Sequence, residues 1–403
     1  MSEGDVERER RGFAARVALL FAALSVIIGT SLPYLPVWLD WAGLGASEIA
    51  VVTAAPLLVR IVVTPLIAFA ADRAGDHRRF LIGLSWACLA GLLALALSRG
   101  FWPILAWTLI FSLAWTTIMP LTETVAMSGV KAAGLDYGRM RLWGSLSFIA
   151  SSLAGGWIVE RLGAVSAIWL VVAGAALTAA AAHGVPQPMG LAARGAGTAR
   201  RLSLAEATGL LGSRTFLTFL AAAGLAQAAH AVFYTFGTLH WRDLGLSTGW
   251  SGTLWAISIV AEVALFAWSA AVVRRIGPVE LIVLGSGAAV VRWLAMGLDP
   301  PLVLLVPLQL LHALTFGATH IGAIHFIGRA VPETRAGTAQ ALYASVTGGI
   351  AMGGAMLLAG PLYAAYAGRA YWAMAVIAAF ALIASLALLR AGPRALQITG
   401  DSR

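Results

Sequence analysis

Five ionisable side chains lie inside apolar stretches of this sequence: Arg60, Glu123, Arg141, Glu262 and Arg292. Each stretch is long enough to cross a bilayer, which takes about 20 apolar residues of helix. A charge at the bilayer centre costs roughly 2.5–3.5 kcal/mol on insertion scales unless it meets a partner or water. Five such charges in five separate stretches therefore indicate a polar cavity inside a helix bundle, as expected of a solute pathway.

The composition places these charges in a membrane protein. Of the 403 residues, 60% are hydrophobic and 11% are charged, whereas soluble proteins carry about 25% charged residues. We therefore expect an all-α membrane protein with twelve transmembrane helices. The apolar segments lie near 13–39, 47–71, 80–98, 102–127, 140–160, 164–183, 214–240, 249–273, 279–297, 301–328, 337–366 and 370–390.

The basic residues predict the orientation. With the N-terminus in the cytoplasm, 20 of the 27 Lys and Arg fall on the cytoplasmic side and four on the other. This positive-inside asymmetry predicts that both termini are cytoplasmic, so the net charge of +9 is a topology signal and not a nucleic-acid footprint. The start of the chain lacks the pattern of a cleaved signal peptide, so the first span is expected to remain as an anchor.

The chain divides into two similar halves. The polar segment 184–213 is expected to be a cytoplasmic linker between six-helix bundles at 13–183 and 214–390, with cytoplasmic tails at 1–12 and 391–403.

An internal repeat supports this division. A shift of 202 residues places Gly43 on Gly245, Gly75 on Gly277 and Arg60 on Glu262. Parallel repeats related by an axis along the membrane normal are a known transporter architecture.

Five motifs follow one another along the chain: Pro33-Tyr34-Leu35-Pro36-Val37-Trp38-Leu39, Asp72-Arg73-Ala74-Gly75, Gly138-Arg139-Met140-Arg141-Leu142-Trp143-Gly144, Arg274-Arg275-Ile276-Gly277 and Leu311-His312-Ala313-Leu314-Thr315-Phe316-Gly317. In this order they resemble the major facilitator superfamily, and within it the lactose-permease-like branch that includes the 3-phenylpropionate:proton symporters. The resemblance covers nearly the whole chain and implies two pseudo-symmetric six-helix bundles.

The resemblance implies a substrate site in the first half. Glu123 and Arg141 match the carboxylate and arginine that hold the sugar in the permease, although a purely structural ion pair is the alternative. Phe148 stands where the permease has a sugar-stacking tryptophan, which suits an aromatic acid at least as well as a sugar. Tyr34 is expected to contact substrate too. Arg60 would serve as counter-charge for an anion, or would pair with Glu262 or Glu123.

Glu262, Arg292 and His312 match the family's proton-coupling network. A carboxylate in a medium of low dielectric constant binds a proton more readily than one in water, and a nearby arginine favours its release. The family's second coupling carboxylate is replaced here by Thr315, which cannot titrate. The coupling proton is therefore expected on Glu262, Glu123 or His312, with Glu262 favoured.

The motif Asp72-Arg73-x-Gly75 resembles the superfamily's cytoplasmic loop motif and is expected to act as a conformational gate, with Asp72 near a helix N-terminus. The alternative is a tight basic turn imposed by the positive-inside rule.

Together these features predict a monomeric secondary transporter in a bacterial inner membrane, one that imports a small organic solute with protons. An aromatic or other small carboxylate ranks first, a sugar or nucleoside second, and a drug/proton antiporter lower. A membrane-embedded enzyme lacks the paired Asp residues it would need, and a channel would show charge rings. No cofactor is expected, and no metal site, because His312, His320 and His325 cannot share one helix face. No motif for ATP binding is present.

Overall fold

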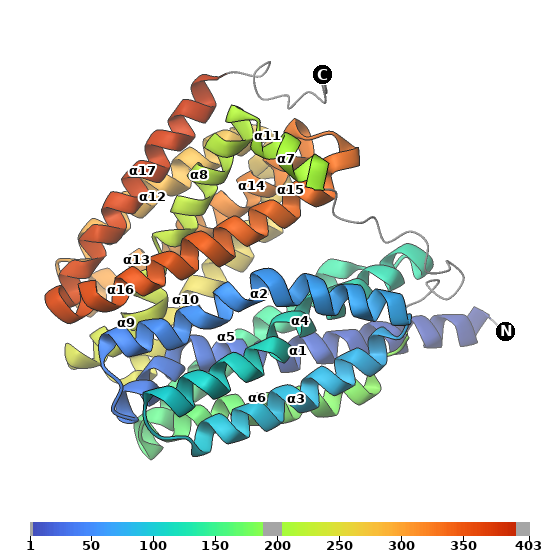
Figure 1. Ribbon diagram of the computed structural model, residues 1–403, viewed down its shortest axis with the longest axis horizontal. Helices are drawn as coiled ribbons and strands as arrows, with labels where there is room; N and C mark the ends of the chain where they lie inside the picture. The colour runs from blue at the N-terminus through green and yellow to red at the C-terminus, as the bar shows by residue number, and fades with distance from the viewer. Residues whose placement is uncertain (1–2, 188–203, 392–403) are drawn as a thin grey trace. The chain divides into compact units, whose positions relative to one another are not determined.

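The computed structural model describes residues 3–187 and 204–391, and within these ranges the chain is helical and contains no β-strand (Figure 1). Eleven helical stretches in the described ranges are long and apolar enough to cross a membrane. The last of them, Glu333–Arg390, is 58 residues long and covers two of the predicted spans. The short 3₁₀ helix η3 (Ala367–Arg369) marks the boundary between the two. The all-α membrane fold predicted from the sequence is confirmed, and the number of spans agrees once this stretch is divided.

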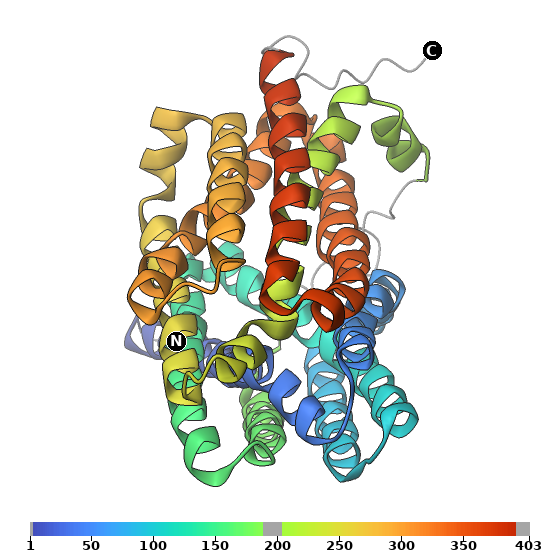
Figure 2. The same cartoon turned by 90° about the vertical axis from the view of Figure 1, so that its left-hand side faces the viewer.

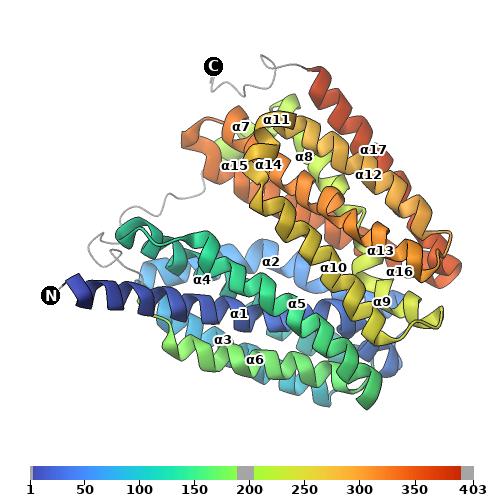
Figure 3. The ribbon, with the colours of Figure 1, turned by 180° about the vertical axis from the view of Figure 1, so that it is seen from behind.

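One compact unit consists of Met1–Arg200 together with Trp241–Ala256. Within it α1 packs along α5 and α6, while α3 packs on α4 and α6 (Figure 3). Fully buried aromatic side chains of α1, among them Phe21 and Tyr34, fill this packing. The helices of this unit are α1 (Glu3–Trp41), α2 (Ala46–Ala74), α3 (His77–Leu97), α4 (Phe101–Ala133), α5 (Tyr137–Leu162), α6 (Ser166–Gly184) and the first part of α10 (Thr248–Ala267).

A second compact unit consists of Arg201–His240 and Ile257–Arg403. In it α12 packs on α14 and α17, and α17, red in Figure 2, also packs on α8. Its further elements are α7 (Leu204–Leu211), α8 (Arg214–Ala228), α9 (Ala231–Asp243), α11 (Ser269–Ile276), α12 (Pro278–Met296), α13 (Leu302–Leu310), η1 (Ala313–Ala318), α14 (Thr319–Ala330), α15 (Glu333–Ser345), η2 (Val346–Ala351), α16 (Met352–Tyr366) and α17 (Ala370–Arg390).

Several spans of this second unit are not continuous α-helices. The predicted span 214–240 breaks at Ala229 and His230, between α8 and α9. The predicted span 301–328 passes from α13 into the π-helix η1, which begins six residues beyond Pro307. Such π-helical turns are frequent at functional sites. Both irregular segments carry side chains of the polar cluster described below.

The internal repeat is visible in the turns. Gly43 and Gly245 both have left-handed backbones, with φ of 89° and 87°. The amide of each donates to the carbonyl three residues earlier, and the next leucine donates to the carbonyl five residues earlier. Gly75 and Gly277 also both have positive φ and close a helix through the same i→i−4 bond. Positions matched in the sequence therefore build the same turns.

The Asp72 motif spans the end of α2. Asp72 lies in the last turn of α2, which runs on to Ala74; its side chain is outside the described residues, so its role in a gate near a helix N-terminus stays a prediction. The N-cap of α3 is Asp76, whose Oδ1 accepts a hydrogen bond from the Arg79 amide at 3.1 Å. Gly75 ends α2 in the left-handed region, and the aspartate that follows it caps α3.

One buried histidine of the second unit links α9 with two chain reversals. The Nε2 atom of His240 lies 2.7 Å from Asp299 Oδ1, and the Tyr363 hydroxyl lies 3.4 Å from His240 Nδ1. A Cβ on Gly368 would collide with both His240 and Asp299. Asp299 has a φ of 51°, which is uncommon outside glycine. The histidine thus contacts the chain reversals that follow α12 and α16.

Asp76 predicts a pH-dependent contribution to stability. Hydrogen bonds from Gln187 and the Arg79 amide, with the charges of Arg79 and Arg78, lower the pKa of Asp76. Its stabilisation is present above the pKa of an unfolded aspartate, about 3.9, and is lost as the pH falls through the lower folded value. Asp76→Asn keeps the cap without the charge. At pH 6 in detergent we expect this variant to unfold at a slightly lower temperature than wild type. The corresponding loss of unfolding free energy is less than about 1 kcal/mol.

The unfolding temperatures of wild type and Asp76→Asn should converge as the pH falls towards 3. A constant difference between them from pH 6 to pH 3 would contradict an electrostatic role for Asp76.

Candidate functional site

A buried arginine organises the interior of the second unit. Arg292 on α12 is inaccessible to solvent. Its Nη1 donates to Thr315 Oγ1 at 3.0 Å and to His312 Nδ1 at 3.1 Å, and its Nη2 donates to Gln309 Oε1 at 2.8 Å. The three acceptors are neutral groups of one chain segment, from the end of α13 into η1. A single cation therefore holds an irregular segment against α12.

Aromatic rings surround the same guanidinium. Its central carbon lies 4.6 Å from the ring centroid of Trp293 and 4.9 Å from that of Phe233. Arginine is well suited to such stacking, since its planar cation is weakly hydrated and is attracted to ring faces. These contacts offset part of the cost of keeping Arg292 away from water.

The hydrogen bonds determine the tautomer of His312. A guanidinium can only donate, so His312 Nδ1 must accept from Arg292. The neutral ring then carries its proton on Nε2, which faces Glu262 Oε2 at 3.5 Å. Glu262 on α10 is 15% exposed, whereas His312 is 3% exposed. The chain Glu262–His312–Arg292 thus links a nearly buried carboxylate to a buried cation through one imidazole.

Thr315 extends this chain to a second histidine. The Thr315 oxygen accepts from Arg292, and it lies 3.0 Å from His230 Nε2. His230 Nδ1 faces the carbonyls of Ala226 and Gln227 at 3.1 and 3.2 Å, so this nitrogen carries a proton. With His230 neutral, Nε2 accepts the Thr315 hydroxyl proton. The position where the family resemblance leads one to expect a carboxylate is therefore occupied by a hydroxyl that joins Arg292 to His230.

The break between α8 and α9 makes this contact possible. The His230 amide donates to Gln227 O at 3.0 Å, in place of the Ala226 carbonyl of a regular α-helix. The Ala226 carbonyl is thereby free to accept from the histidine ring. Broken helices whose freed carbonyls serve as ligands are typical of transporter sites.

The cluster around Arg292 contains hydrogen-bond donors without an acceptor. Arg292 Nε and Gln309 Nε2 are buried and have no hydrogen-bond acceptor among the described residues. The amide oxygen of Gln309 also accepts from Ser258 Oγ at 3.1 Å. Buried unpaired donors cost about 1–3 kcal/mol each, which makes this cluster a strained, donor-rich part of the interior.

In the first unit, Tyr137 connects the predicted pair Glu123 and Arg141. The Tyr137 side chain hydrogen-bonds with both residues, and Glu123 and Arg141 also interact electrostatically. Glu123 comes from α4, whereas Tyr137 and Arg141 are one turn apart on α5. The structure thus brings together the two residues that the sequence paired, with a tyrosine that the sequence analysis overlooked.

A glycine makes room for the Arg141 guanidinium. A Cβ at Gly144 would lie 2.6 Å from Arg141 Nη1 and 2.9 Å from Ser25 Oγ. The guanidinium carbon is also 5.5 Å from the centre of the Phe21 ring. Arg141 therefore folds back along its own helix towards α1, in a position that depends on Gly144.

The other predicted substrate residues are Arg60, Phe148 and Tyr34. Arg60 on α2 is partly buried, and none of the described residues hydrogen-bonds its side chain. Phe148 is 8% exposed. Tyr34 is fully buried and donates to Ser152 O at 2.5 Å, so its hydroxyl holds α1 on α5. Its predicted contact with substrate, like the roles of Arg60 and Phe148, stays a prediction.

The sequence analysis also overlooked Gln309 and Ser258. Gln309, His312 and Thr315 follow one another at intervals of three, a helical stripe of polar side chains in an apolar span. This stripe was a usable signal. Ser258 had none, because a single serine in a membrane helix commonly bonds its own backbone.

Residues 16–374 match the model of the MFS_1 like family. The chain belongs to this family of the major facilitator superfamily. It is 31% identical to a "Probable 3-phenylpropionic acid transporter" of Escherichia coli (strain K12), over 87% of this chain and 91% of that protein. It is 30% identical to a maltose permease of Geobacillus stearothermophilus, over 84% and 86% of the two chains.

Solved structures agree with this assignment at the level of the fold. The crystal structure of the nucleoside transporter NupG superposes with a TM-score of 0.80 and 18% identity, over 94% of this chain and 98% of that one. The family predicted from the motifs is confirmed. The protein is a multi-pass membrane protein and a secondary transporter, and it is not an enzyme.

Thr315 predicts a distinctive pattern of stability. Thr315→Val keeps the shape but leaves Arg292 Nη1 and His230 Nε2 with one partner fewer, so we expect a loss of about 1–3 kcal/mol in unfolding free energy. Thr315→Ser retains the hydroxyl and should stay within about 1 kcal/mol of wild type. Thermal unfolding of the three purified proteins in detergent measures this. Equal stability of the Val and Ser variants would contradict the hydroxyl link.

Proposed function

We propose that the protein is a proton-coupled symporter that imports a small organic carboxylate, an aromatic acid such as 3-phenylpropionate ranking first. The proposal places a monomer in a bacterial inner membrane with both termini in the cytoplasm. The bundles 13–183 and 214–390 would alternate access to the substrate, with Asp72, Arg73 and Gly75 in the conformational gate. The observation that carries the proposal is the Glu262–His312–Arg292 chain inside one unit.

This chain can exchange one proton at a defined atom. With Glu262 ionised, its charge is attracted to Arg292, and the His312 N–H faces its Oε2 at 3.5 Å. Protonation of Glu262 removes that attraction without leaving a second bare charge, because Arg292 keeps its neutral acceptors. The two protonation states thus favour different distances between α10 and the Arg292 cluster. A conformational equilibrium responds to a ligand that distinguishes its states, and here that ligand is the proton.

The charges of the first unit support an anionic substrate. Arg60 is not hydrogen-bonded by any described residue, and Arg141 interacts with Glu123 and Tyr137. A guanidinium in a site of low dielectric constant binds a carboxylate through paired, charge-assisted hydrogen bonds. The name of the Escherichia coli relative points the same way.

A sugar or nucleoside symporter is the second candidate. The Geobacillus relative is a maltose permease, and the Glu123–Tyr137–Arg141 group offers both acceptors and donors to hydroxyl groups. Uptake assays with both classes of solute separate the two candidates.

Glu262→Gln tests the proton coupling. In proteoliposomes with a pH gradient, we expect this variant to lose proton-driven accumulation of the substrate while retaining exchange of internal for external substrate. The amide cannot bind or release the proton, although its shape is kept. Glu333→Gln on the exposed start of α15 serves as the matched control and should accumulate substrate normally. Unchanged accumulation by Glu262→Gln would remove Glu262 from the coupling.

Gly144→Ala tests the substrate role of Arg141. The added methyl group displaces the end of a flexible side chain, so folding should be little affected, while the guanidinium must move. We expect KM for the substrate to rise roughly tenfold with kcat nearly unchanged, as for about 1.4 kcal/mol of lost binding.

Gly83→Ala on α3 is the matched control, because nothing lies within 4 Å of its new Cβ. If Gly144→Ala has the KM of wild type, Arg141 does not contact the substrate from its present position.

A further inference from the structure

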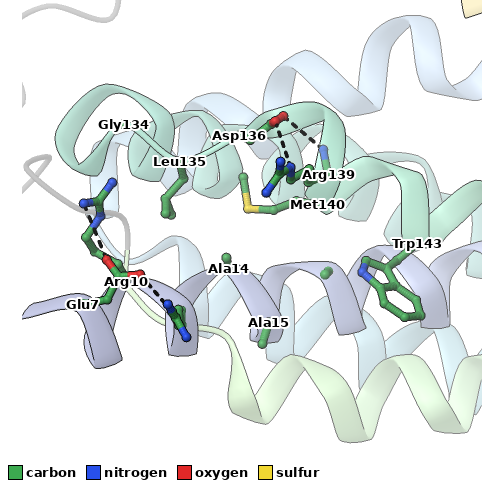
Figure 4. A pocket seen from close by; sticks show the side chains of 12 residues that line it. Glu7, Arg10, Ala14, Ala15, Gly134, Leu135, Asp136, Arg139, Met140 and Trp143 are labelled. Atoms are coloured by element: carbon green, nitrogen blue, oxygen red, sulfur yellow. Dashed lines mark hydrogen bonds and ion pairs between the residues drawn. The ribbon is translucent and has the colours of Figure 1, made fainter. Parts of the chain in front are cut away.

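A groove runs along one face of α1 at the end of the first unit that is predicted to be cytoplasmic (Figure 4). It has a volume of about 350 Å³ and lies between α1 and the α4–α5 turn with the start of α5. On α1 the lining residues recur every three or four positions from Glu7 to Ala18, a single helical stripe of about 16 Å.

Basic side chains line one end and the middle of the groove. Arg10 lies near Glu7 at one end, and Arg139 on α5 lies farther along, beside Met140 (Figure 4). Arg11 and the acid Asp136 also line the groove. Each acid already binds an arginine of its own helix: Glu7 lies 2.8 Å from Arg11, and Asp136 lies 3.4 Å from Arg139. The three arginines outnumber the two acids, and the side chains of Arg11 and Arg139 remain 81% and 88% exposed.

Arg10 is only loosely paired. Its Nη1 approaches Glu7 Oε2 at 3.7 Å, and 40% of its side chain is exposed. The positive charge of Arg10 is therefore accessible to an anion in the groove.

The other end of the groove is apolar. Ala14, Ala15 and Ala18 form a shallow floor on α1, and Met140 and Trp143 line the wall on α5. In Figure 4 the Trp143 indole lies at the end of the groove opposite Glu7. Trp143 is 57% exposed and lies two turns into a membrane-spanning helix. Tryptophan at such a position is typical of the membrane interface, where an amphipathic ring meets lipid headgroups.

This gradient from basic to apolar along the helix matches an amphiphile better than a soluble anion. We propose that the groove binds one anionic phospholipid of the adjoining leaflet, with its phosphate between Arg10 and Arg139 and the upper part of an acyl chain over Ala14 and along Trp143. Basic pockets between membrane helices recognise lipid phosphates in this way. The lining of the groove shares no residue with the proposed substrate site, and the proposal does not depend on the transported solute.

Native mass spectrometry of the delipidated protein tests the site, with phosphatidylglycerol and phosphatidylcholine as probes. We expect phosphatidylglycerol to bind more tightly, and Arg10→Gln and Arg139→Gln each to weaken it about fivefold. Ala14→Trp fills the floor without changing a charge and should abolish tight binding. Arg329→Gln, an exposed arginine at the end of α14, is the matched control and should bind as wild type.

Three results would overturn the proposal. Equal affinity for the two lipids would exclude recognition of the anionic headgroup. An equal loss in Arg329→Gln would show general attraction to basic surface. Displacement of the lipid by an equal concentration of glycerol 3-phosphate would show a site for soluble anions, with no contribution from the apolar end.

Discussion

The guanidinium of Arg292 is a permanent positive charge in the interior of the second unit, and the arrangement around it follows from the need to satisfy it. Thr315, His312 and Gln309 accept its hydrogen bonds, while Phe233 and Trp293 cover its faces. Without these partners the buried cation would be strongly unfavourable. The segment that supplies the acceptors is irregular for the same reason, since a π-helical turn is retained where its side chains have a task.

The acceptors of Arg292 are neutral, and this matters for coupling. A carboxylate bound directly to the arginine would form a tight pair that resists protonation. Here Glu262 is one imidazole away, at 3.5 Å from His312, and remains 15% exposed. It can gain or lose a proton while the Nη1 and Nη2 atoms of Arg292 keep their neutral acceptors. Thr315 is also linked to His230. His230 in turn faces the Ala226 and Gln227 carbonyls at the break between α8 and α9, and this anchors the cluster to the backbone there.

Much of this architecture could be predicted from the sequence, because membrane spans, positive-inside loops and buried charges are strong signals. The repeat matched Gly43 with Gly245, which form the same turn in the structure, and the motifs predicted the family. The irregular helices could not be predicted, since apolar spans read alike whether continuous or broken. The N-cap of α3 at Asp76 was not predicted, because two aspartates flank the turn and only the end of α2 decides which of them precedes α3. The His230–Thr315 contact joins residues 85 positions apart and depends on the break in α8–α9.

Proton flux is the most direct measure of the central claim. Purified protein in sodium-free liposomes containing a trapped pH-sensitive dye would receive 3-phenylpropionate at pH 7.5, with protein-free liposomes as the control for diffusion of the neutral acid. The account predicts lumenal acidification that is faster than in the control and saturates with substrate concentration. Uptake of the acid that requires sodium, or that leaves the lumenal pH at the control rate, would contradict it.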